Sequence, residues 1–272
     1  MTAFLSLKDA IGDLVPDGAS VAMEGFTHLI PFAAGHEIIR QGKKGLTLLR
    51  MTPDLIYDQL IGMGCAQEVV FSWGGNPGVG SLYRLRDAIE NEYPNRIDVV
   101  EHSHAAMANA YAAGAAGLPF AVFRGYVGVD LVNVNSTIKS IECPFTGERL
   151  ACVPSHRPDV TIVHAQRANR RGDVLVEGII GVQKEAVLAA RKAIVTVEEI
   201  VDELGPIGPN ACVLPRWTVD AIVEAPGGSW PSYTHGYSKR DNAFYLAWSE
   251  ISKDRERFHQ WIEQHVMKAA VA

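Results

Sequence analysis

Short apolar runs alternate with segments of helical periodicity through the first half of the chain, and this alternation constrains the fold more than any other feature. It is typical of βα units, whose strands lie parallel in one sheet. The expected strands are 21–23, 46–51, 68–73 and 97–100, and the expected helices are 31–41, 53–63, 82–93 and 104–115. Ser81 is the expected N-cap of the third helix. The first half therefore predicts an open parallel sheet flanked by helices.

The second half departs from this rhythm. Thr146-Gly147 and Arg171-Gly172-Asp173 have the composition of hairpin turns. Further expected elements are a helix over 183–191, strands over 194–197 and 219–223, and a mainly helical segment over 241–266. No linker rich in proline, serine or charge divides the chain. The sequence thus predicts a single α/β domain over residues 1–272, with a mostly parallel sheet and some antiparallel edge strands.

Charge and hydropathy limit the partners of the chain. Its 31 acidic and 25 basic residues give a net charge of −6, which argues against binding to nucleic acid. Residues 102–123 contain no Asp, Glu, Lys or Arg, but they are rich in Ala and Gly and are interrupted by Asn109 and Pro119. A membrane span needs more large apolar side chains than this. We therefore expect a buried helix followed by a strand, and no membrane contact.

Three further observations concern assembly and location. The mean hydropathy of +0.04 is high for a soluble monomer, which favours a buried interface between chains and hence an oligomer. Residues 1–13 contain no basic region followed by an apolar run, so no secretory signal is expected. The four cysteines show no C-x-x-C spacing, as is usual for reduced thiols. We expect a cytoplasmic protein.

Ligands of open α/β sheets bind beyond the carboxyl ends of the strands, where the βα loops meet. Three such loops carry unusual residues: Gly25-Phe26-Thr27-His28, residues 73–81, and Glu101-His102-Ser103-His104. We expect them to converge on one site. Substrate or CoA binding is assigned to Thr27, His28, Trp73, Gly74, Gly75, Asn76 and Gly78.

The second loop is glycine-rich. Gly74, Gly75, Gly78 and Gly80 precede an expected helix, and such a loop presents backbone N–H groups at the positive end of the helix dipole. This arrangement favours an anion or an oxyanion. The alternative is a tight turn whose glycines adopt positive φ angles.

The third loop supplies the leading acid/base candidate. Glu101 follows the apolar strand 97–100, where partial burial would raise the pKa of its carboxyl group toward values useful for proton transfer. The alternative role is to cap the next helix. His102 and His104 are candidate proton-transfer groups, and without a third ligand we expect them to bind no metal. Cys143, Cys152 and His156 lack a paired half-site, so zinc is not expected there either.

Five motifs together carry a resemblance that spans most of the chain. They are Val21-Ala22-Met23-Glu24-Gly25-Phe26-Thr27, Met51-Thr52-Pro53-Asp54-Leu55-Ile56, Ser72-Trp73-Gly74-Gly75-Asn76-Pro77-Gly78, Glu101-His102-Ser103-His104 and Ala113-Gly114-Ala115-Ala116-Gly117-Leu118-Pro119. With them the chain resembles an α chain of the class I CoA-transferase family, of the glutaconate CoA-transferase-like type. It is most similar to the α chain of the actinobacterial hydrolase that opens the last steroid ring in cholesterol degradation.

The resemblance implies a CoA thioester as substrate and no other cofactor. It also implies a separate β-type chain, typically in an α2β2 assembly, which carries the nucleophilic glutamate of the transferases. Glu101 matches a glutamate position of α chains. Glu24 stands where α chains commonly have glycine, which places a second carboxylate near the site.

Two reactions follow from this resemblance. In the first, Glu101 removes a proton from water, which cleaves a cyclic β-oxo acyl-CoA by hydrolysis while the loop 74–80 stabilises the oxyanion. The alternative is transfer of CoA between carboxylic acids through a glutamyl anhydride and thioester on the partner chain. A third interpretation, of another class, is a ligand-sensing module without catalysis.

Overall fold

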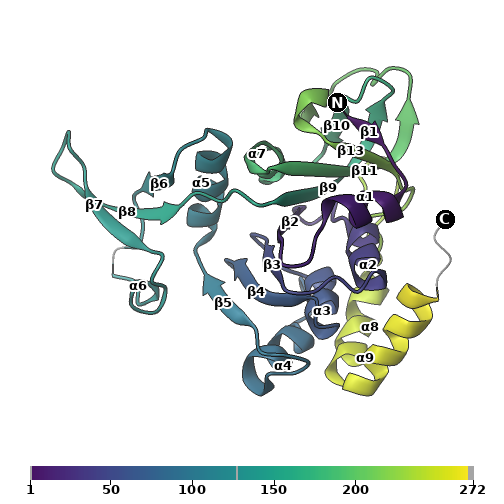
Figure 1. Cartoon of the computed structure of the whole chain (residues 1–272), viewed down its shortest axis with the longest axis horizontal. Helices are drawn as coiled ribbons and strands as arrows, with labels where there is room; N and C mark the ends of the chain where they lie inside the picture. Colours follow the sequence, from purple (N-terminus) through teal and green to yellow (C-terminus); the bar gives the residue numbers. More distant parts are fainter. Residues whose placement is uncertain (1, 127, 269–272) are drawn as a thin grey trace.

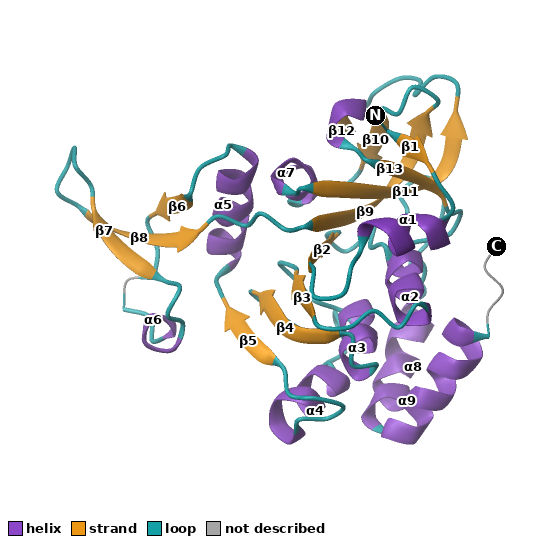
Figure 2. Ribbon diagram, in the orientation of Figure 1, coloured by secondary structure: helices purple, strands orange, loops and turns teal. Residues whose placement is uncertain are grey.

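The computed structural model describes residues 2–126 and 128–268. Its main sheet has ten strands (Figures 1 and 2). Eight of them follow the order β1 (Ala3–Phe4), β13 (Ala221–Glu224), β11 (Lys192–Val201), β9 (Val160–Asn169), β2 (Ser20–Glu24), β3 (Leu46–Leu49), β4 (Ala66–Phe71), β5 (Asp98–Glu101). All neighbours along this path are parallel. The predicted α/β fold with a mostly parallel sheet is confirmed.

Antiparallel strands occur in two places. β10 (Val174–Glu177) pairs with β9 and with β12 (Ala211–Leu214) at one end of the main sheet. A separate three-stranded sheet contains β6 (Phe120–Phe123), β8 (Arg149–Pro154) and β7 (Lys139–Glu142), with the short helix α6 (Leu131–Val134) nearby. Figure 1 shows this small sheet projecting from the main body. The predicted hairpin turns at Thr146-Gly147 and at 171–173 join β7 to β8 and β9 to β10.

Helices cover both faces of the main sheet. One face packs against α1 (Leu7–Leu14), α2 (Phe32–Arg40), α3 (Leu55–Gly62), α4 (Tyr83–Asn91), α8 (Asn242–Lys253) and α9 (Arg255–Ile262), followed by a π-helical turn over Glu263–Met267. The other packs against α5 (His104–Ala115) and α7 (Gln183–Ala189). Side chains alternate accordingly along β2, where Val21 and Met23 face the first layer and Ala22 faces the second.

The charge-free segment 102–123 forms α5 and β6, as predicted. Small residues let α5 approach its neighbours closely: a Cβ atom on Gly114 would lie 1.9 Å from the carbonyl oxygen of His156. In the described ranges, no helix combines the length and the apolar character that crossing a membrane requires.

Candidate active site

A pocket of about 180 Å³ lies beyond the carboxyl ends of β2, β3 and β4. Its wall consists of Phe26, Thr27, Ile30, Arg50, Thr52, Asp54, Trp73, Pro77, Arg240 and Tyr245. These residues come from three βα loops and from the region where α8 begins. Parallel sheets bind their ligands in this position. Two of the predicted loops therefore converge as expected, and Thr27 and Trp73 line the pocket.

The first loop has a strained backbone that its surroundings hold in place. Thr27 and Leu29 have φ angles of 63° and 55°, and each such residue costs about 1–3 kcal/mol. A Cβ atom on Gly25 would lie 2.6 Å from the carbonyl oxygen of Leu29, so this turn requires glycine. Leu29 N–H donates to the carbonyl of Tyr233 at 2.9 Å. The segment before α8 thus fixes the loop that carries Thr27.

His28 lies outside the pocket. Its side chain is buried, stacks on Tyr233 with ring centroids 5.0 Å apart, and places Nε2 2.9 Å from the backbone of Ile179. Burial lowers the pKa of His28 and so favours a neutral ring. The residue anchors the first loop, and the assignment of His28 to substrate contact is corrected on this ground.

A buried ion pair forms the floor of the pocket. Arg50 follows β3, and its guanidinium group donates to Asp54 Oδ1 at 2.9 Å and to the carbonyl of Gly25 at 3.0 Å. Glu24 lies close to this pair but does not line the pocket. Its Oε1 accepts the N–H of Met51 at 3.0 Å. Complete burial raises the pKa of Glu24, which the charge of Arg50 only partly offsets.

The glycine-rich loop does not form the predicted anion cradle. The N–H groups of Gly75, Asn76 and Gly80 donate to backbone carbonyls within the protein. The N-terminus of α4 is also occupied: the N–H groups of Arg84 and Leu85 donate to Asp58 Oδ1 at 2.8 and 3.0 Å. A carboxylate of the protein itself thus satisfies the positive end of this helix.

The loop shapes the pocket instead. Asn76 is buried and its amide donates to the carbonyl of Tyr245 at 2.7 Å, which joins the loop to α8. The N-cap position of α4 is Leu82, and the prediction of Ser81 is wrong. Gly74 and Gly78 do not belong to the pocket wall.

Replacing Gly75 by alanine is expected to lower activity more than stability. The added Cβ atom would lie 2.6 Å from the ring of Trp73, which is 44% exposed and therefore free to move. The displaced ring would reshape the pocket wall. Gly80→Ala is the matched control, because nothing lies within 4 Å of its Cβ position. Turnover and melting temperature of both variants check this, and equal activities would show that Trp73 does not shape the site.

The third predicted loop lies apart from the pocket. Glu101 ends β5 at the edge of the main sheet and is exposed, so its predicted partial burial is wrong. His104 begins α5 and is exposed as well. His102 is buried, with Nδ1 3.3 Å from Tyr126 Oη and Nε2 3.4 Å from Thr137 Oγ1. Burial lowers the pKa of His102. None of the three residues lines the pocket.

Over residues 2–126 and 128–268, no three His, Cys, Asp or Glu side chains are grouped as metal ligands. This holds for His102 and His104 and for Cys143, Cys152 and His156.

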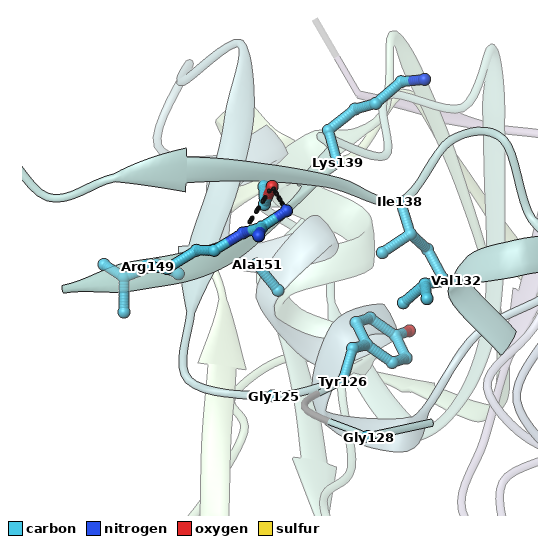
Figure 3. A pocket seen from close by; sticks show the side chains of 10 residues that line it. Gly125, Tyr126, Gly128, Val132, Ile138, Lys139, Arg149 and Ala151 are labelled. Carbon is cyan, nitrogen blue, oxygen red and sulfur yellow. Dashed lines mark hydrogen bonds between the residues drawn. The ribbon is translucent and has the colours of Figure 1, made fainter. Parts of the chain in front are cut away.

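A larger cavity of about 680 Å³ lies against the small sheet (Figure 3). Figure 3 shows Tyr126, Val132 and Ile138 close together, with the Lys139 ammonium group pointing away from them. Arg149 donates to Ser140 Oγ through Nε and Nη2 at 3.1 and 2.9 Å. The wall, as far as the structure describes it, contains no carboxylate and none of the predicted site residues. The acid/base chemistry of the strand ends is therefore concentrated in the smaller pocket.

Four pocket residues were missed from the sequence: Arg50, Asp54, Arg240 and Tyr245. A signal existed for two of them. Arg50 directly follows an apolar strand, and Asp54 belongs to the motif Met51-Thr52-Pro53-Asp54. Arg240 and Tyr245 lie far from these residues in the chain, and no spacing connects them.

Comparison with known proteins identifies relatives over nearly the whole chain. Residues 4–225 match the family model "Coenzyme A transferase". The chain is 63% identical to one of the subunits of the 3-oxoadipate CoA-transferase of Pseudomonas knackmussii, over 98% of this chain and 94% of the relative. The crystal structure of glutaconate CoA-transferase from Acidaminococcus fermentans superposes with a TM-score of 0.91 at 31% identity, covering 98% of this chain and 89% of that one.

The hydrolase to which the sequence pointed is a more distant relative. The cholesterol ring-cleaving hydrolase IpdA subunit of Rhodococcus jostii is 25% identical, over 96% of this chain and 91% of the relative. The comparisons therefore favour the transferase interpretation over the hydrolase interpretation.

Proposed function

Because this chain belongs to the coenzyme A transferase family, we propose that it is the α chain of an enzyme that transfers CoA between a dicarboxylic acid and a second carboxylic acid. The identity of 63% with a 3-oxoadipate CoA-transferase chain carries this proposal, because it extends over almost the full length of both chains. 3-Oxoadipate and glutaconate, which appear in the names of two relatives, are both dicarboxylates. Membership of an enzyme family also argues against a purely ligand-sensing role.

The nucleophile is assigned to a separate β-type chain. Asp54 is the only carboxylate in the pocket wall as described, and Arg50 binds it. Attack by a glutamate of the β-type chain on the thioester forms an anhydride and releases the CoA thiolate. The thiolate then attacks the glutamyl carbonyl and releases the first acid, and the acceptor carboxylate reverses both steps. As the family resemblance implies, we expect an α2β2 assembly.

Acceptor dependence tests the proposal. The complex with the β-type chain is incubated with succinyl-CoA, with and without 3-oxoadipate. Transfer predicts that thioester is consumed in proportion to the acceptor and that CoA reappears on 3-oxoadipate. Equal loss of thioester without any acceptor would contradict transfer and support hydrolysis.

Replacing Glu101 by glutamine separates the two reactions further. In the transferase account Glu101 lies outside the pocket, so the Gln variant is expected to retain transfer within about tenfold of wild type. If Glu101 were the general base of a hydrolase, the loss would be about 10²–10⁴-fold. Steady-state turnover of the complex measures the difference, and a loss in that larger range would return Glu101 to the centre of the mechanism.

A further inference from the structure

We propose that Arg240 binds the free carboxylate of the acyl group, the one that is not joined to CoA. This inference rests on the proposed transferase function and adds the substrate class to it. It assigns the terminal carboxylate of a dicarboxylic acyl-CoA to the pocket at the ends of β2, β3 and β4.

The environment of Arg240 holds the side chain in place. One terminal nitrogen donates to the carbonyl of Pro77 at 2.8 Å, and the guanidinium carbon lies 4.0 Å from the ring centroid of Tyr245. Its Nε–H is buried and has no acceptor in the described chain. A buried donor without an acceptor costs about 1–3 kcal/mol. A ligand oxygen in the pocket would supply one.

The charges of the pocket wall are unbalanced. Two arginines face one carboxylate, since Arg50, Asp54 and Arg240 are the charged residues of the described wall. Arg50 and Asp54 neutralise each other through the 2.9 Å ion pair. No described carboxylate lies within 4.0 Å of Arg240. One positive charge therefore remains for an anionic ligand, and arginine is well suited to bind a carboxylate through two parallel hydrogen bonds.

The size of the pocket selects the acyl group rather than CoA. A cavity of about 150 Å³ holds one benzene molecule, whereas sites for drug-sized ligands measure about 300–1,000 Å³. At about 180 Å³ the pocket fits a short acyl chain but no nucleotide. Phe26, Trp73 and Pro77 provide apolar walls for the methylene groups, and Thr27 and Thr52 provide hydroxyl groups. This combination matches a short chain that ends in a carboxylate.

The test compares two acceptors in the complex with the β-type chain: 3-oxoadipate, and 3-oxohexanoate, which lacks the terminal carboxylate. Arg240→Gln is expected to lower kcat/KM for 3-oxoadipate by about 10- to 100-fold, the loss of one charge-assisted hydrogen bond. For 3-oxohexanoate we expect a change below about threefold, because that acceptor makes no such bond. Lys239→Gln removes a neighbouring exposed charge outside the pocket and should leave both values unchanged.

Arg240→Lys keeps the charge and is expected to restore part of the preference for 3-oxoadipate, and it carries the test if the Gln variant does not fold. An equal loss with both acceptors, or an unchanged preference in both variants, would overturn the role of Arg240 while leaving the transferase function intact. Failure of the wild-type complex to transfer CoA to either acceptor would overturn the proposed function, and this inference with it.

Discussion

Replacing Arg50 by methionine is expected to lower the free energy of unfolding by about 3–5 kcal/mol, because removing one partner of a buried pair leaves the other charge uncompensated. Asp54 is only 1% exposed and Glu24 only 2%. Both carboxylates lose their nearest cation in this variant. Urea denaturation, followed by fluorescence, measures the change.

Two controls isolate the buried charge as the cause. The double variant Arg50→Met, Asp54→Asn removes both members of the pair and should recover part of the lost stability. Arg86→Met breaks an ion pair with Glu90 in which both side chains are more than half exposed, and it should cost below about 1 kcal/mol. If Arg50→Met were as stable as Arg86→Met, the pair would not support the pocket floor.

The chain without its β-type partner is expected to show no CoA transfer, with activity at least about 10⁴-fold below that of the complex, as is usual when a nucleophile is removed. The structure offers no free carboxylate for the attack within the described pocket. Asp54 is bound by Arg50, Glu24 is buried outside the wall, and Glu101 lies on the edge strand. Turnover of succinyl-CoA by the purified chain, before and after addition of the β-type chain, measures the effect.

The control for this experiment is folding. Circular dichroism and the melting temperature of the chain alone show whether inactivity reflects a missing nucleophile or a missing fold. Substantial transfer by the folded chain alone would place the nucleophile in this chain and contradict the assignment.

The architecture was largely readable from the sequence because parallel strands and amphipathic helices leave local patterns. The strands that form β2 to β5 and the helices between them were expected near their observed positions. Strand order was not readable. β9 pairs with β2 through contacts such as Val21 with Val160, and no local pattern specifies a contact of that sequence separation.

That missing order explains the errors at the site. Glu101 follows an apolar strand, which suggested burial, but β5 lies at the sheet edge and leaves the residue exposed. The glycine-rich loop precedes a helix, which suggested an anion site, but Asp58 from α3 already caps that helix. Arg240 meets Pro77 and the pocket only through tertiary folding. In each case a distant segment decided the role of a local motif.

The fate of solvent oxygen tests the transferase account most directly. The complex with the β-type chain is supplied with succinyl-CoA and 3-oxoadipate in water enriched in ¹⁸O, and the released succinate is examined by mass spectrometry. Transfer takes the new carboxylate oxygen from the enzyme glutamate and, over many turnovers, from the acceptor acid, so the account predicts succinate without ¹⁸O. Succinate that carries one solvent oxygen per molecule would show that water attacks the thioester, and would contradict it.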